Sequence, residues 1–175
     1  MGKTIAEKIL GTHSGADCSA GDLVVAELDC VMAQDGTAPL AIRAFREMGG
    51  RRVWDPSRIA LVVDHNAPSP TESVSALHAM MRGFAREQGV VLHDVGDGVC
   101  HQLLPEMGYV GPGDLVVGAD SHTCTYGAIN AFATGVGSTD LAAAMLTGRL
   151  WFKVPPSIRV VLEGRLPPGV YSKDG

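Results

Sequence analysis

The sequence predicts an α/β domain with a largely parallel sheet, and three observations lead to this prediction. Apolar runs of strand length recur along the chain, segments with helical periodicity lie between them, and glycine or polar residues mark the boundaries. The predicted strands are residues 22–29, 58–63, 90–94, 114–118 and 157–163. Strands that alternate with helices of this length are typical of parallel sheets.

The first half of the chain contains three predicted helices. Residues 4–10 begin with Thr4 and Glu7, which fit a capping box, and Gly11 can end this helix. Residues 37–48 have one apolar side and stop at two glycines. Residues 70–88 form a long helix capped by Ser69 or Thr71 and closed by Gly89.

The second half of the chain is predicted to contain shorter elements. A short segment covers residues 101–106, a small-residue helix covers 126–133, and another helix runs from residue 138 or 139 to about 146. The amino terminus of the helix near Tyr126 would point its N–H groups at an anion.

Composition and charge exclude several classes of protein. The chain has 175 residues, 46% of them hydrophobic and 19% charged, which fits one globular domain. A net charge of −5 with scattered Lys and Arg argues against nucleic-acid binding. No apolar run approaches the 18 or so residues of a membrane span and no secretory signal is recognisable, so we expect a cytoplasmic location.

Two predicted strands end in titratable clusters. Asp64, His65 and Asn66 follow one strand, and Asp120, Ser121 and His122 follow another. Ligands of open α/β sheets bind outside the carboxyl ends of the strands, so both clusters are expected to face one crevice. An Asp can fix the tautomer of a nearby His, which suits such pairs to moving protons.

Structural explanations compete with these assignments. Either Asp is equally at home as a helix N-cap, and a His beside an apolar run, such as His101, is more often structural than functional. Ser121 lacks the surroundings of a nucleophile and is better suited to donate to a substrate carboxylate. His78 reads as a surface or helix-face residue.

Five motifs in order resemble the aconitase superfamily, in particular its 3-isopropylmalate dehydratase large-subunit branch and the archaeal-type subgroup that also contains homoaconitases. The resemblance covers the whole chain. The motifs are residues 4–10 (TIAEKIL), 34–39 (QDGTAP), 63–66 (VDHN), 98–102 (GVCHQ) and 117–128 (VGADSHTCTYGA), the last continuing through TGVGSTD at 134–140.

The resemblance implies a three-layer α/β/α aconitase-like domain and a hydro-lyase that isomerises a 2- or 3-hydroxy polycarboxylate at a 4Fe–4S cluster. 3-Isopropylmalate in leucine biosynthesis is the expected substrate, with homoaconitate and dimethylmalate as alternatives. The implied catalytic residues are Asp64, His65, His101, Asp120 and His122. Gln34 and Ser121 are implied to bind a substrate carboxylate.

The resemblance is incomplete at the cluster. The cysteine motifs that hold the cluster in the family do not occur here, and Cys18, Cys30, Cys100 and Cys124 form no C-x-x-C pair. We therefore expect the chain to be the N-terminal portion of a large subunit, with no metal ligands of its own. The expected division is residues 1–165 as the domain and 166–175 as a connection. A small swivel-domain subunit is the implied partner.

Two other classes of function stay open. One is a noncatalytic remnant that binds a carboxylate or a partner, which the missing cysteine motifs favour. The other is a zinc hydrolase with His65, His101 and His122 as ligands. The isolated chain is also expected to expose an apolar face and to self-associate.

Overall fold

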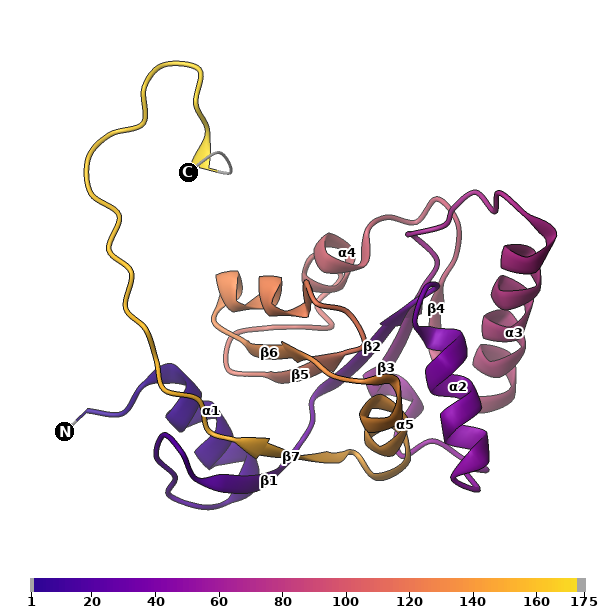
Figure 1. The fold of residues 1–175 in the computed structure, drawn as a ribbon, viewed down its shortest axis with the longest axis horizontal. Coiled ribbons are helices and arrows are strands. Elements are labelled where there is room, and N and C mark those ends of the chain that lie inside the picture. Colours follow the sequence, from indigo (N-terminus) through magenta and orange to yellow (C-terminus); the bar gives the residue numbers. More distant parts are fainter. Residues whose placement is uncertain (1, 173–175) are drawn as a thin grey trace.

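A five-stranded parallel sheet forms the centre of the chain in a computed structural model, which describes residues 2–172 (Figure 1). The strand order is β4-β3-β2-β5-β6, and every neighbouring pair is parallel. The strands are β2 (Cys30–Gln34), β3 (Ile59–Val62), β4 (Val91–His93), β5 (Leu115–Gly118) and β6 (Phe132–Gly135). The predicted α/β class with a parallel sheet is confirmed.

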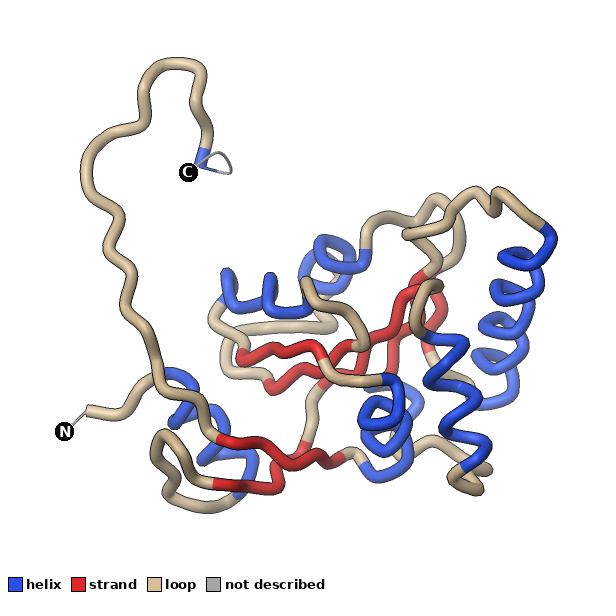
Figure 2. Tube along the Cα trace, in the orientation of Figure 1, coloured by secondary structure: helices blue, strands red, loops and turns tan. Residues whose placement is uncertain are grey.

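Helices cover both faces of this sheet, as the red strands between blue helices in Figure 2 show. The larger core joins one face of the sheet to four helices, and the smaller core joins the other face to two short ones. The first group is α1 (Ile5–Ser14), α2 (Ala38–Glu47), α3 (Glu72–Gln88) and α5 (Ser138–Thr147). The second is α4 (Cys100–Glu106) and the 3-10 helix η2 (Thr123–Ile129). The predicted three layers are therefore present.

The central strand β2 shows why both faces must be covered. All five of its residues are buried. Val31 and Ala33 point into the larger core, whereas Cys30 and Met32 point into the smaller one. The sequence analysis did not identify this strand, because it follows residues 22–29 with almost no turn between them.

The predicted strand over residues 22–29 belongs to a second, smaller sheet. β1 (Leu23–Glu27) pairs antiparallel with β7 (Arg149–Lys153), outside the parallel sheet. The prediction of a strand at 157–163 is wrong. That segment lies extended and apart from the other elements in Figure 1, and Ile158 and Leu162 are 89% and 86% exposed. It pairs with none of the strands that residues 2–172 form.

Two helix predictions also need correction. α1 continues past Gly11 to Ser14 and ends at Gly15, whose left-handed φ of 67° suits a glycine C-cap. The helix predicted over residues 126–133 is a 3-10 helix that begins earlier, at Thr123, and ends at Ile129, and residues 132–133 belong to β6. Its C-cap, Asn130, adopts a left-handed conformation, which turns the chain into β6.

The remaining predicted helices and strands agree with the structure to within a few residues. Thr71, rather than Ser69, caps α3 through its side chain, and Gly89 closes that helix. The 3-10 turn η1 (Pro56–Arg58) leads into β3. Among the described residues, no helix is both long and apolar enough to cross a membrane. The division at residue 165 stays a prediction.

Candidate active site

Both predicted clusters lie at the carboxyl edge of the sheet, on the loops that follow β3 and β5. β2 runs between these two strands, parallel to each, and its own carboxyl end supplies Gln34 and then Asp35. The loops therefore leave the sheet at one edge and approach each other there. This confirms that parallel strands bring Asp64 and Asp120 to one place.

Asp64 and His65 form a hydrogen-bonded pair. His65 Nδ1 lies 2.7 Å from Asp64 Oδ1, and Asp64 Oδ2 accepts a 2.6 Å bond from the N–H of Cys100, the first residue of α4. The Asp64 side chain is 3% exposed and that of His65 is 37% exposed. Asp64 therefore accepts the N–H at the start of α4 and also holds the Nδ1 side of His65. Nε2 of His65 is the nitrogen left free of Asp64, and it lies 3.7 Å from Asp120 Oδ2.

A buried carboxylate, Asp35, holds this loop in place. Its oxygens accept the N–H groups of His65 and Asn66, each at 2.8 Å, and of Asp64 at 3.3 Å. His78 Nε2 lies 3.1 Å from Asp35 Oδ2. Burial raises the pKa of Asp35, but these hydrogen bonds outweigh burial and leave the pKa below its ordinary value.

The role of Asp35 could not be read from the sequence. Of the two alternatives for His78, the surface position is wrong, and His78 instead lies on the buried face of α3. His78 is 2% exposed and packs in the interior beside the loop that carries Asp64. The pattern of α3 gives no sign of this, because the partner of His78 comes from the end of β2, 43 residues away.

Asp120 is the acceptor that the histidines share. Its side chain is 9% exposed, and Oδ1 accepts a 2.7 Å bond from the N–H of His122. His65 Nε2 is 3.7 Å from Oδ2, and His101 Nε2 is 2.9 Å from Oδ1. Burial raises the pKa of Asp120, but the His122 N–H, His101 and the Gln34 side chain together hold the pKa below its ordinary value.

His101 approaches Asp120 without a well-formed hydrogen bond. The two atoms are within ion-pair distance, yet neither buried ring nitrogen of His101 has a partner with hydrogen-bond geometry. The ring is 15% exposed and lies 5.8 Å from the ring of Tyr126 and 6.0 Å from that of His122. The imidazole of His101 is therefore mostly enclosed, and none of the described residues forms a well-aligned hydrogen bond with either of its buried nitrogens.

Ser121 and His122 form the outer rim. The side chain of His122 is 75% exposed, and its Nδ1 lies 3.2 Å from Ser121 Oγ and 3.5 Å from Asp120 Oδ1. Gln34 differs, because it is 5% exposed and its side chain bonds to Asp120 and to the N–H of Gly36. Gln34 thus positions Asp120 in this structure, whereas Ser121 and His122 face outward.

Two glycines allow the Asp120 turn to pack this closely. A Cβ added to Gly135 would lie 2.5 Å from the carbonyl oxygen of Asp120, and one added to Gly118 would lie 2.3 Å from Thr123 Oγ1. Both distances are shorter than side-chain atoms can approach. Glycine is therefore required at positions 118 and 135, because the backbone packs too closely there for a side chain.

The described cysteines do not fit an iron–sulfur cluster. Cys18, Cys30 and Cys100 are buried, Cys124 is exposed, and no group of ligand atoms in residues 2–172 contains more than one of the four. Burial raises the pKa of Cys30 to about 12 and also raises that of Cys100, which disfavours the thiolate that a cluster needs. These residues do not hold a cluster with three cysteine ligands.

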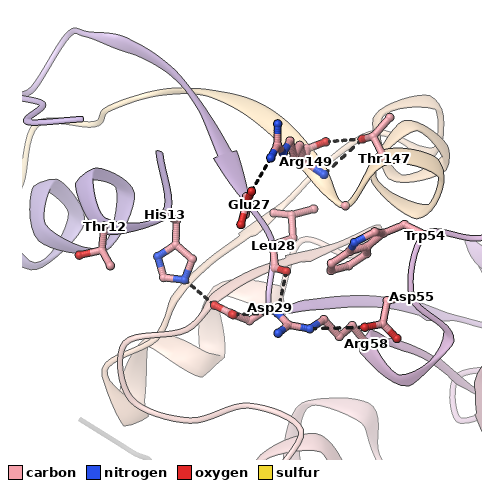
Figure 3. Close-up of a pocket in the computed structure, with 11 residues that line it drawn as sticks. Thr12, His13, Glu27, Leu28, Asp29, Trp54, Asp55, Arg58, Thr147 and Arg149 are labelled. Atoms are coloured by element: carbon pink, nitrogen blue, oxygen red, sulfur yellow. Dashed lines mark hydrogen bonds and ion pairs between the residues drawn. The ribbon is translucent and has the colours of Figure 1, made fainter. Parts of the chain in front are cut away.

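A second polar region lies at the opposite edge of the sheet, where a cavity of about 820 Å³ opens between α1, β7 and the residues that precede β2 and β3 (Figure 3). His13 Nε2 lies 2.5 Å from Asp29 Oδ2, and Arg58 Nη1 lies 3.1 Å from Asp29 Oδ1. Arg58 also stacks over Trp54, and Arg149 pairs with Glu27. The charged groups here bind one another and leave little for a ligand.

Comparison with known proteins identifies the family. A sequence profile of the aconitase family (aconitate hydratase) matches residues 7–174. Over 99% of its length the chain is 55% identical to 3-isopropylmalate dehydratase large subunit 1 of Methanopyrus kandleri and 54% identical to that of Thermotoga maritima. It is 56% identical to the 3-isopropylmalate dehydratase large subunit of Syntrophus aciditrophicus.

The chain spans 42% of the length of the Methanopyrus and Syntrophus proteins and 41% of the Thermotoga protein. Its parallel α/β/α architecture, the Asp and His pairs at the carboxyl edge and the profile match over residues 7–174 all agree. The chain belongs to the aconitase family.

Proposed function

We propose that this chain supplies the proton-transferring residues of the active site of a hydro-lyase. The enzyme would interconvert 3-isopropylmalate and 2-isopropylmalate in leucine biosynthesis. The relatives named above support the substrate, since all three are named for 3-isopropylmalate dehydratase. The activity belongs to a protein longer than 175 residues, because the chain matches 41–42% of each relative.

One observation carries the proposal: His65, on the loop after β3, and His101, in α4, converge on Asp120. His65 Nε2 is 3.7 Å and His101 Nε2 is 2.9 Å from its carboxylate. Dehydration removes a hydroxyl and a carbon-bound proton, and rehydration returns them, so the site must both give and take protons. Two imidazoles around one ionised carboxylate meet that need.

His65 is proposed to deliver the proton to the leaving hydroxyl. Asp64 holds Nδ1, so the proton moves at Nε2, the nitrogen that lies on the Asp120 side of the ring. His101 and Asp120 form the second pair, which accepts or returns a proton at the departing water. The group that removes the carbon-bound proton is proposed to lie outside these 175 residues.

Ser121 and His122 are proposed to contact a substrate carboxylate. Both lie at the outer rim, and the hydroxyl and imidazole can donate to an anion. Gln34 is proposed to reach substrate only if it releases Asp120, to which its amide is bonded here. Its first role is therefore to orient that carboxylate.

Family membership supports an iron–sulfur cluster in the complete enzyme, with cysteine ligands that are not among the four described here. Such a cluster supplies Lewis-acid chemistry when bound. The name "large subunit" likewise supports a small subunit as partner. Both statements are proposals about the complete enzyme.

The test uses a chimeric protein. Residues 1–175 replace the matching segment of the Thermotoga maritima large subunit, and this chimera is co-purified with the small subunit of the Thermotoga enzyme. We expect turnover of 3-isopropylmalate near that of the parent, because the replaced segment is 54% identical. The same chimera is offered homoaconitate and dimethylmalate, which tests the two alternative substrates.

The matched controls are Asp120→Asn and Asp29→Asn, which change aspartates at opposite edges of the sheet. Asp120→Asn should lower kcat/KM by about 10²–10⁴-fold while the chimera still assembles. A chimera that assembles, carries its cluster and yet turns over none of these hydroxy acids would contradict the proposal and favour a noncatalytic binding role.

A further inference from the structure

Residues 157–163 form an extended stretch of chain that follows β7 and lies apart from both sheets (Figure 1). We call these residues the exposed segment. Its aliphatic side chains Ile158, Val160 and Leu162 are 89%, 77% and 86% exposed. Within residues 2–172, no N–H or carbonyl group of the exposed segment takes part in a backbone hydrogen bond. Unpaired backbone groups of this kind are a template for pairing with another strand.

The sequence limits the exposed segment at both ends. Pro155 and Pro156 precede it, and a proline has no N–H to give to a neighbouring strand. Gly164 follows it with a φ of 104°, a left-handed conformation that turns the chain away from the extended path. Between these limits, the aliphatic side chains at positions 158, 160 and 162 share one face, as the period of a strand requires. The exposed segment therefore has the length and pattern of a strand.

The side chains of the exposed segment are complementary to themselves when two copies run antiparallel. If Val161 lies opposite Val161 of a second copy, Arg159 of each copy faces Glu163 of the other. Val160 faces Leu162 in the same way. Opposite charges that face each other across an antiparallel pair stabilise it, and contact between aliphatic side chains removes them from water. One register therefore satisfies both charges and brings the aliphatic side chains together.

Other registers lose these contacts. A pair centred on Leu162 would place Arg159 opposite Arg165, and like charges in that position are destabilising. A pair centred on Val160 would place Arg159 opposite Val161 and leave its charge unmatched. Parallel strands in register would set Arg159 beside the same residue of the other copy. These differences favour antiparallel pairing centred on Val161.

We propose that two copies of this chain form a two-fold symmetric dimer in which their exposed segments pair antiparallel, centred on Val161. The contact is a single pair of short strands, so the dimer is weak and reversible. The self-association expected of this chain then depends on one segment and not on general apolar exposure. The proposal does not rest on the hydro-lyase function, because association is measured without turnover.

The experiment is sedimentation velocity of the 175-residue chain over a series of concentrations, with a reducing agent that keeps the exposed Cys124 from forming a disulfide. We expect a monomer–dimer equilibrium. Arg159→Glu sets two carboxylates opposite each other at both charged positions, and Glu163→Arg does the same with two guanidinium groups. Each variant alone should dimerise about 10-fold more weakly or worse.

The sharpest result comes from mixing the two variants. In a mixed dimer, each chain faces the opposite charge at both positions, so Arg159→Glu and Glu163→Arg together should recover the affinity of the unchanged chain. Hydrogen exchange should show that the amides of residues 157–163 become protected as the concentration rises. The control is Arg52→Glu, which makes the same change of charge at an exposed residue outside the exposed segment and should leave the equilibrium unchanged.

Three outcomes would overturn the proposal. A chain that stays monomeric at every concentration would mean that the exposed segment pairs only with another part of a longer protein. A dimer that neither charge change weakens would place the contact elsewhere, such as the exposed face of β1 and β7 with Leu23, Val25 and Trp151. A mixture of the two variants that fails to recover dimerisation, with both variants folded by circular dichroism, would exclude the antiparallel register centred on Val161.

Discussion

Each edge of the parallel sheet carries an Asp–His contact, but the two contacts differ in what surrounds them. At the amino edge, both nitrogens of His13 are engaged, one by Asp29 at 2.5 Å and one by the carbonyl of Ile9 at 2.8 Å. At the carboxyl edge, His101 lies 2.9 Å from Asp120 with both nitrogens unpartnered. The same residue types therefore serve structure at one edge and remain available for chemistry at the other.

The partners of Asp29 and Asp120 differ in the same way as those of the two histidines. Asp29 accepts the N–H of Leu115 at 2.9 Å and pairs with Arg58 and His13, so it ties α1, η1 and β5 to the start of β2. Among residues 2–172, Asp120 pairs with no arginine or lysine, and its neighbours are histidines and the amide of Gln34. An imidazole can give a proton to Asp120 or take one from it, whereas a guanidinium partner stays protonated.

The largest effect should come from breaking the carboxyl edge. In the chimera, Asp64→Asn removes the carboxylate that holds the Nδ1 side of His65. Because general acid–base catalysis contributes about 10²–10⁴-fold, kcat/KM should fall within that range while assembly is retained. Steady-state kinetics measures it, with Glu27→Gln at the amino edge as the control. Equal losses in both variants would remove the distinction between the two edges.

The second prediction concerns stability and tests the role of Asp35, the buried carboxylate that holds the loop of Asp64 and His65. Asp35→Ala leaves three N–H groups and His78 without their acceptor. Removing one partner from a buried charged network costs about 3–5 kcal/mol, so the free energy of unfolding should fall by that much. Urea denaturation measures the change. A loss of less than a tenth of this would mean that the loop is held by other contacts.

Acidification should act on a smaller scale through Asp94. The side-chain hydrogen bonds from Arg82 lower its pKa from 3.8 to about 2. Since the folded pKa lies below the unfolded one, this pair stabilises the fold above about pH 4 and loses its effect as the pH falls towards 2. Melting temperature against pH should therefore decline less steeply in Asp94→Asn. An unchanged slope would show that the pair contributes nothing.

The smallest effect is expected at the rim of the amino-edge cavity. Arg149 and Glu27 are 61% and 64% exposed in their side chains, so solvent screens their attraction. Arg149→Ala should change the free energy of unfolding by less than about 1 kcal/mol. Thermal melts at low and high salt measure this. A large loss that salt does not reduce would mean that the cavity wall depends on this pair.

The sequence analysis located the site because it follows directly from parallel topology. Strands at 58–63 and 114–118 end in Asp–His clusters, and parallel strands bring such ends together. The assignment of His101 needed the family resemblance, because its position against Asp120 depends on how α4 packs across the sheet. The catalytic roles of all these residues stay predictions.

The parts that the sequence analysis missed depend on contacts between distant segments. β2 lies in the middle of the sheet, but its five residues are few and follow β1 closely, so periodicity did not separate them. The structural role of Asp35 could not be predicted, because nothing local shows its bonds to residues 64–66. The segment at 157–163 alternates like a strand, yet pairing requires a neighbouring edge, which the described residues do not offer.

The central claim is that the carboxyl edge performs chemistry and the amino edge maintains structure. Its most direct test compares Asp120→Asn with Asp29→Asn in the chimera, measuring kcat/KM and melting temperature for each. Asp120→Asn should lower kcat/KM by about 10²–10⁴-fold with little change in melting temperature. Asp29→Asn should lower the melting temperature and keep kcat/KM per folded enzyme. The reverse pattern, or equal loss of activity in both, would contradict the account.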